Sequence, residues 1–202
     1  MKRKSVLVFL FVLMFTSNVF AQTKVYTVKR GDTMWKIAVK HQIGISEIIS
    51  ANPQIKNPAL IYPGQKINIP SIDDVKAQEN EVIRLVNVER AKKGLPALKA
   101  NWQLSRVARY KSQDMVDKGY FSHTSPTYGS PFRMMESFGI KYTAAGENIA
   151  MGQRTASEVM NAWMNSPGHR NNILSPSFSE IGVGLAKGPN GRLYWTQMFI
   201  KQ

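Results

Sequence analysis

The segment Asn165–Leu174 reads NSPGHRNNIL, and the organisation of the second half of the chain can be worked out from it. Residues 155–163, just before it, have the apolar spacing of a helix and open with TASE, a capping box. Pro167 is expected to end this helix, because proline cannot continue a helical hydrogen-bond ladder. His169 is then expected at a turn, with apolar residues just behind it.

Two earlier segments supply the side chains that we expect to meet His169. They are FSH at residues 121–123 and GEN at residues 146–148, so that His123 and Glu147 join it. Two imidazoles and a carboxylate suit proton transfer, and two neutral imidazoles also suit a divalent metal ion. The sequence predicts that all three side chains stand on loops.

The composition favours a folded protein with anionic partners. The chain has 202 residues, 43% of them hydrophobic, which is enough for one ordinary domain and a small one. Lysine and arginine number 27 against 13 aspartates and glutamates, a formal net charge of +14. Such a charge suits nucleic acid, acidic membranes and acidic wall polymers alike. The absence of cysteine excludes disulfides, thiol catalysis, thiolate metal ligands and a lipid-modified cysteine.

Residues 1–21 have the pattern of a secretory signal peptide. Three basic residues at positions 2–4 precede an apolar run over residues 6–15, and a cleavage point is expected before Gln22. The run is short for a bilayer span, so an uncleaved anchor is the weaker interpretation and no stable transmembrane anchor is expected. Export argues against a nucleic-acid partner and favours anionic polymers of the cell envelope.

Residues 24–70 predict a strand, two helices and a strand in that order, a βααβ unit. β-Prone runs stand at both ends of the segment. The turn GDT at residues 31–33 caps the first helix, and NP at residues 52–53 ends the second. Trp35 and Ile37 are expected in the core of this unit.

The same residues strongly resemble a LysM domain. The matching pieces are YTV at 26–28, RGDTMWKIA at 30–38, ANP at 51–53, LIYPGQKI at 60–67 and IP at 69–70. The resemblance implies binding of glycans that contain N-acetylglucosamine (GlcNAc), chiefly peptidoglycan or chitin. It places the glycan groove between the first turn and the loop before the last strand. The residues implied are Gly31, Asp32, Thr33 and Met34 on one wall and Leu60, Ile61 and Tyr62 on the other.

Residues 71–78 lack apolar periodicity and are expected to be a short connector. In residues 79–202, helical spacing comes first and strand alternation last. The alternating runs at residues 180–185 and 193–199 are joined by GPNG, the turn of a hairpin, and residues 142–150 are expected to hold a third strand. Helices packed on a small antiparallel sheet, an α+β class, are predicted.

These residues look like the CAP superfamily (cysteine-rich secretory proteins, antigen 5 and pathogenesis-related proteins) in its bacterial form. The marks, in order, are LVNVER at 85–90, GYFSHTSP at 119–126, AGENIA at 145–150, AWMNSPGHR at 162–170, EIGVG at 180–184 and YWTQ at 194–197. The resemblance implies a three-layer α-β-α sandwich whose cleft holds two histidines and two acids. His123 and His169 match the histidines and Glu147 matches one acid. The second acid falls near Ser166, so the tetrad is incomplete here.

The chemistry of this cleft stays open between several interpretations. His123 and His169 would hold Zn²⁺ or another divalent cation, although two protein ligands alone make a weak site. In a hydrolase, Glu147 would be the base, His169 would orient it, and Ser122 or Ser166 would be the nucleophile. The plainer alternative is that His123 and Glu147 hydrogen-bond each other and hold the loops together.

We expect a secreted, extracellular bacterial protein that its LysM-like domain holds on peptidoglycan or a related GlcNAc polymer. Anionic wall polymers are expected as further partners of the basic surface. The CAP-like domain is expected to be displayed on the wall in a binding or scaffold role. Two alternatives remain, a metal-assisted hydrolase of wall or protein substrates, and a protein that assembles into a spore or envelope layer.

Overall fold

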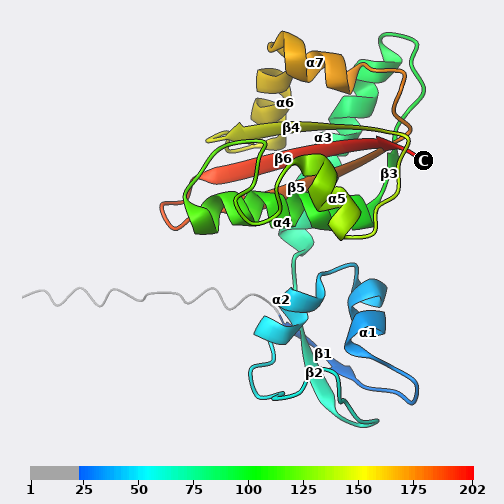
Figure 1. Ribbon diagram of the computed structural model, residues 1–202, viewed down its shortest axis with the longest axis vertical. Coiled ribbons are helices and arrows are strands. Elements are labelled where there is room, and N and C mark those ends of the chain that lie inside the picture. Colours follow the sequence, from blue (N-terminus) through cyan, green and yellow to red (C-terminus); the bar gives the residue numbers. More distant parts are fainter. Residues whose placement is uncertain (1–22) are drawn as a thin grey trace, which may run out of the picture.

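The computed structural model describes residues 23–202, so the predicted signal peptide at residues 1–21 lies outside the described residues. Two domains follow one another along the chain (Figure 1). The N-terminal domain consists of β1 (Thr23–Thr27), α1 (Met34–His41), α2 (Ile45–Ser50) and β2 (Lys66–Pro70). The two strands pair antiparallel, with Tyr26 opposite Ile67. This order confirms the predicted βααβ unit.

Local sequence explains how the N-terminal domain is held together. Thr33 is the N-cap of α1, and its side chain accepts a hydrogen bond from the backbone N of Lys36 at 3.1 Å. The buried amide of Asn52 donates to the carbonyl oxygens of Ile48 and Asn68, both at 2.7 Å, and thereby ties α2 to β2. The core between the helices and the strands consists largely of isoleucines, namely Ile37, Ile43, Ile48, Ile67 and Ile69.

Trp35 differs from its prediction, because it does not lie in this core. Ile37 is 1% exposed as expected, whereas Trp35 is 46% exposed. On α1, the inward stripe is formed by Met34, Ile37 and Ala38. Trp35 follows Met34 by one position, about 100° further round the helix, and therefore points away from the stripe. Its ring instead faces the C-terminal domain, 5.3 Å from the guanidinium carbon of Arg106.

The C-terminal domain has one four-stranded sheet between two layers of helices. Its elements are α3 (Asp73–Ala91), β3 (Lys99–Ala100), α4 (Trp102–Lys118), α5 (Pro131–Ser137), β4 (Ala144–Met151), α6 (Ala156–Met164), α7 (Pro167–Ile173), β5 (Glu180–Lys187) and β6 (Leu193–Lys201). The strand order is β3-β5-β6-β4, and only β3 and β5 run parallel. Helices α4 and α5 cover one face, and α3, α6 and α7 cover the other (Figure 1). The three-layer α-β-α sandwich is thereby confirmed.

Each face of the sheet packs its own apolar core. On the side of α3 and α6, Trp163 and Val86 pack against Trp195 and Phe199 of β6. On the side of α4 and α5, the core contains the fully buried Met198 of β6. Alternation along β6 explains this arrangement, because successive side chains of a strand point to opposite faces.

The join between the domains differs from the expected connector. Helix α3 begins at Asp73, so most of residues 71–78 belong to its first turns. Ile72, just before α3, packs against the core of the N-terminal domain, and Val75, inside α3, packs against that of the C-terminal domain. The sequence did not predict these helical turns because most of their residues are polar. Only one side of the helix is covered here, so the turns lack a clear apolar periodicity.

Two other elements of the C-terminal domain are found as predicted, the hairpin and the third strand. The turn at residues 188–191 closes the hairpin of β5 and β6, with the backbone N of Gly188 donating to the carbonyl oxygen of Arg192 at 2.8 Å. The expected third strand is β4. Within residues 23–202, every helix is too short or too polar to cross a membrane.

Candidate functional site

The three predicted site residues come from three different kinds of element. His123 lies on the loop after α4, as predicted, but Glu147 lies on strand β4 and His169 lies on helix α7. The prediction of a loop for His169 was wrong because Pro167 was interpreted only as the end of the preceding helix. Proline also fits the first position of a new helix, where its missing N–H is not needed, and α7 starts there.

His123 and Glu147 form a direct pair. Nδ1 of His123 donates to Oε1 of Glu147 at 2.7 Å. The imidazole is 53% exposed, whereas the carboxylate side chain is 2% exposed. Burial raises the pKa of Glu147, and the hydrogen bond from His123 and the positive charge of Lys111 oppose this rise. The pair therefore presents an exposed imidazole that a buried acid orients from behind.

The second carboxylate oxygen of Glu147 has no donor within the described residues. Oε2 is buried and has no hydrogen-bond partner among residues 23–202. A buried acceptor without a partner is costly, and such groups concentrate at functional sites. The carboxylate therefore keeps one oxygen without a donor among these residues, which fits the raised pKa of Glu147.

His169 lies near this pair, and the charge of His123 affects the pKa of His169. Burial lowers the pKa of His169, and the positive charge of His123 lowers it further. The carbonyl oxygen of His169 accepts a hydrogen bond from the amide of Asn148 on β4 at 3.1 Å. The structure thus brings His123, Glu147 and His169 together at the edge strand β4 of the sheet, where this strand is packed against α7.

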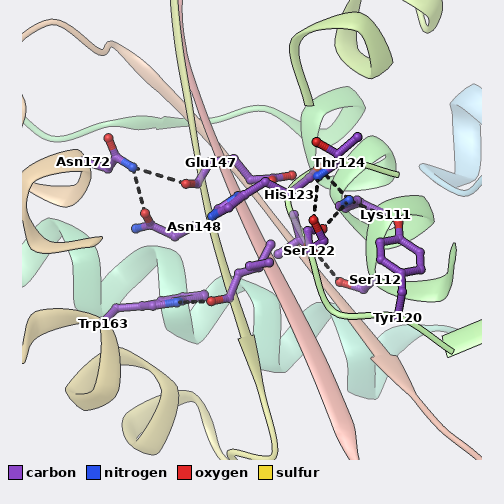
Figure 2. Close-up of polar contacts among 12 residues, drawn as sticks. Lys111, Ser112, Tyr120, Ser122, His123, Thr124, Glu147, Asn148, Trp163 and Asn172 are labelled. Carbon is purple, nitrogen blue, oxygen red and sulfur yellow. Dashed lines mark hydrogen bonds and ion pairs between the residues drawn. The ribbon is translucent and has the colours of Figure 1, made fainter. Parts of the chain in front are cut away.

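Two asparagines fix α7 against β4. The amide of Asn172 donates to the carbonyl oxygen of Glu147 at 3.2 Å and to Oδ1 of Asn148 at 2.8 Å (Figure 2). Asn148 is fully buried and also donates to Oε1 of Gln197 on β6 at 2.9 Å. These hydrogen bonds fix the position of α7, which carries His169, relative to β4, which carries Glu147.

Lys111 is a site residue that the sequence analysis missed. It is fully buried on α4, and its Nζ donates to the carbonyl oxygens of Ser122 and His123, both at 2.8 Å, and to the Tyr120 hydroxyl at 3.1 Å (Figure 2). The sequence position of Lys111 could have identified it, because Lys111 falls on the apolar stripe of α4 that includes Ala108 and Met115. A lysine on a buried stripe indicates a buried charge with partners.

The candidate nucleophiles are not joined to the histidines. The Ser122 hydroxyl is exposed and accepts a hydrogen bond from the backbone N of Thr124 at 3.2 Å. Ser166 precedes α7 and makes no capping hydrogen bond through its side chain. In the described part of the chain, no hydrogen bond links either hydroxyl to His123 or His169. A serine nucleophile needs such a base within reach.

The donor set does not make a strong metal site. Over the described range, no three His, Asp or Glu side chains are placed so that they could hold one metal ion. Ser166 stands where a second acid would be needed, and Nδ1 of His123 is already engaged by Glu147. Metal binding by His123 and His169 alone stays a prediction, and we derive no chemical step from it.

The predicted glycan residues divide into buried and exposed sets. Met34 is 3% exposed, and Ile61 packs partly buried against the same core. Asp32 accepts hydrogen bonds from the Tyr26 hydroxyl and the backbone N of Lys29, both at 2.8 Å. The side chains of Met34 and Asp32 are thus engaged within the domain.

Leu60 and Tyr62 are the exposed members of that set. They are 53% and 59% exposed and border a hollow of about 350 Å³. The rest of its lining comes from residues 54–57 and Gln65 rather than from residues 31–34. The structure therefore brings Leu60 and Tyr62 of the second predicted wall to a hollow, whereas Ile61 and the first predicted wall are not part of its lining.

We expect that replacing His123 by glutamine raises the pKa of His169 toward its ordinary value. Glutamine keeps a hydrogen-bond donor for Glu147 but removes the positive charge that disfavours protonation of His169. The pKa is measured from the pH titration of the His169 ring signals by NMR. The matched control is His41→Gln in the N-terminal domain, which should leave this titration unchanged. An unchanged pKa in the His123 variant would show that the two imidazoles do not interact.

Comparison with known families gives a match for each domain. Residues 83–199 match CAP, the cysteine-rich secretory protein family, and residues 26–70 match the LysM domain. Together the two matches span most of the described chain and coincide with the two domains of the structure.

Two of the similar proteins come from a bacillus and from a Bacillus phage. The uncharacterized protein YkwD of Bacillus subtilis (strain 168) is 59% identical over 126 residues, which cover 62% of this chain and 48% of YkwD. An endolysin of Bacillus phage B103 is 43% identical over 49 residues, which cover 24% of this chain and 19% of the endolysin.

A solved structure shares the fold. It is an extracellular protein containing an SCP domain from Bacillus anthracis str. Ames, with a TM-score of 0.60 and 32% identity over 69% of this chain and 47% of that chain. In each of these three comparisons, the match spans less than half of the other protein's length.

Proposed function

Because the chain belongs to the CAP family of cysteine-rich secretory proteins and carries a LysM domain, we propose that it is an exported protein of the cell wall. Its LysM domain binds peptidoglycan through GlcNAc units, and its CAP domain binds a further ligand or partner at the His123–Glu147 pair. The predicted signal peptide at residues 1–21 supports export.

The observation that carries glycan binding is the exposed apolar pair Leu60 and Tyr62 beside the hollow of the LysM domain. Apolar side chains of this kind cover the faces of sugar rings, while nearby amides bond the acetamido groups. Gln54, Asn57 and Gln65 line the same hollow and supply such amides. The arrangement suits an uncharged, N-acetylated sugar.

The charge of the LysM domain supports a second contribution to wall binding. Between residues 24 and 70, seven lysines and arginines stand against two acidic residues, Asp32 and Glu47. A basic surface attracts anionic wall polymers, and salt weakens that attraction. Glycan contacts through Leu60 and Tyr62 would persist at high salt, so the two contributions can be separated.

A binding role for the CAP domain follows from its polar contacts. Glu147 orients His123, and Lys111 and Asn172 hold the surrounding backbone in place. The rigid frame leaves the exposed imidazole of His123 for a ligand, with the buried carboxylate of Glu147 behind it. Within the described residues, neither Ser122 nor Ser166 is hydrogen-bonded to a histidine, which favours binding over cleavage by a serine nucleophile.

We expect the double replacement Leu60→Ser, Tyr62→Ser to weaken binding of a soluble GlcNAc tetramer at least tenfold. The change removes the apolar cover of the sugar faces, and both side chains are exposed, so the domain should remain folded. Affinity is measured by isothermal titration or by NMR shifts.

Val25→Ser is the matched control for this experiment, because Val25 is 55% exposed on the same domain and lies outside the hollow. Equal affinities for the double variant and the Val25 variant would contradict the proposed glycan site.

The second candidate function is a hydrolase of wall or protein substrates. The raised pKa of the buried Glu147 favours it, since burial moves this carboxyl group toward the range that suits acid–base chemistry. Incubation of the protein with purified cell walls tests it directly. Release of soluble fragments by the natural protein, and none by Glu147→Gln, would replace the binding role with catalysis.

A further inference from the structure

The two domains meet through a small set of contacts from α4. The hydroxyl of Tyr110 donates to Oε2 of Glu47 on α2 at 2.9 Å and lies 2.9 Å from Oγ of Ser46. A Cβ at Gly44 would overlap this hydroxyl, so the close approach depends on glycine. One turn earlier on α4, Arg106 stacks on Trp35. The LysM domain is therefore docked on the CAP domain.

A cavity of about 490 Å³ lies beside this contact, and both domains form its walls. The LysM domain contributes Glu47 and Ser50 of α2, and the CAP domain contributes Arg109, Gln113 and Asp117 of α4. Figure 1 shows α2 at the side of the LysM domain that faces α4. The volume falls in the range of small-molecule sites, about 300–1,000 Å³.

Arg109 is the unusual group in this cavity. The residue is 8% exposed, and its Nε lies 3.1 Å from Oε1 of the buried Glu79. Its Nη1 is buried and, within the part of the chain that the structure describes, has no hydrogen-bond partner. A buried guanidinium donor without an acceptor is costly, and an acceptor on a ligand would remove that cost.

The other charged residues of the lining are all acidic. Glu47, Asp114 and Asp117 line the cavity with Arg109, in a chain whose net charge is +14. The Asp114 carboxylate is already engaged by the hydroxyls of Tyr120 and Ser125. Glu47 accepts hydrogen bonds from Ser46 and Tyr110 through Oε2, and Asp117 accepts one from Gln113 through Oδ1, so within residues 23–202 one oxygen of each carboxylate has no hydrogen bond. These carboxylates favour a positively charged group on a ligand.

We propose that the interdomain cavity binds a short peptide that carries a free ammonium and a free carboxylate. The carboxylate would meet Arg109, and the ammonium would meet Glu47 or Asp117 from the other side of the cavity. The peptide stems of peptidoglycan present this chemistry close to the glycan that the LysM domain binds. The inference rests on the proposed function in naming that source.

The test uses the chain without residues 1–21 and the tripeptide lysyl-D-alanyl-D-alanine as probe. We expect saturable binding, weakened at least tenfold when both amines are acetylated and again when the carboxylate is amidated. Ser50→Trp and Gln113→Trp, at exposed positions on opposite walls, should each fill the cavity and weaken binding at least tenfold.

Ser157→Trp is the matched control, because Ser157 is an exposed residue beside a different hollow, lined by Leu85 and Met160. It should leave peptide affinity unchanged. No binding at millimolar tripeptide, or binding that neither cavity-filling variant weakens, would overturn the inference. If a GlcNAc tetramer still binds in that case, the proposed function stands, so the two failures are distinguishable.

Discussion

Gly184→Ala is expected to lower the free energy of unfolding by about 3 kcal/mol or more, the upper range for overpacking a core. A Cβ at Gly184 of β5 would overlap the backbone of α4 at Ala108 and Arg109. Backbone atoms cannot rotate away as a side chain can, so α4 would have to move off the sheet. This separation would open the core that contains Leu104 and Met198.

The matched control is Gly168→Ala on α7, where a Cβ meets nothing within 4 Å. Alanine is favoured over glycine in helices by up to about 1 kcal/mol, so this variant should be as stable as the natural protein or slightly more stable. Chemical denaturation followed by circular dichroism measures both variants. Equal stability of the two would show that α4 does not pack on β5 as closely as described.

Lys111→Met is expected to cost about 3 kcal/mol and to loosen the loop that carries His123. The replacement leaves the partly buried carbonyl oxygens of Ser122 and His123 without their shared donor, and each unsatisfied group costs about 1–3 kcal/mol. It also removes the positive charge that opposes the raised pKa of Glu147, which should therefore rise further.

Hydrogen exchange of residues 121–125 separates loosening of this loop from a general loss of stability. Faster exchange should be confined to the loop at conditions where the natural protein and the variant are both folded. Lys118→Met, the same change at an exposed position of α4, is the control. It should alter neither the free energy of unfolding nor the hydrogen exchange of residues 121–125. Normal exchange of the loop in Lys111→Met would show that Lys111 does not hold His123.

Much of the fold could be predicted because local patterns determine it. Alternation in residues 180–185 predicts β5. The glycines of this alternating run also indicate where α4 packs on the sheet. Gly182 and Gly184 share one face of the strand, with Ile181 and Val183 on the other. A face made of glycines allows a helix to approach the sheet closely.

The wrong predictions have two causes. One residue type can fit two local structures, and a side chain can contact the other domain instead of the core of its own. Pro167 both ends α6 and starts α7, and only the second role places His169 on a helix. Trp35 is apolar and was expected in the core, but it contacts Arg106 of the other domain. The pairing of His123 with Glu147 could be expected as a meeting of two segments, whereas its distance and burial depend on the packed sheet.

The most direct test of the proposed anchoring is sedimentation with purified peptidoglycan from which anionic polymers have been removed. The chain without residues 1–21 is mixed with these walls at low salt and at 0.5 M salt. The higher concentration screens attraction between surface charges, because the screening length falls from about 10 Å at 0.1 M salt to about 3 Å at 1 M. We predict that the protein sediments at both salt concentrations and that Leu60→Ser, Tyr62→Ser stays in solution at high salt. Sedimentation that disappears with salt, or that the double variant retains, would contradict glycan binding by the LysM domain.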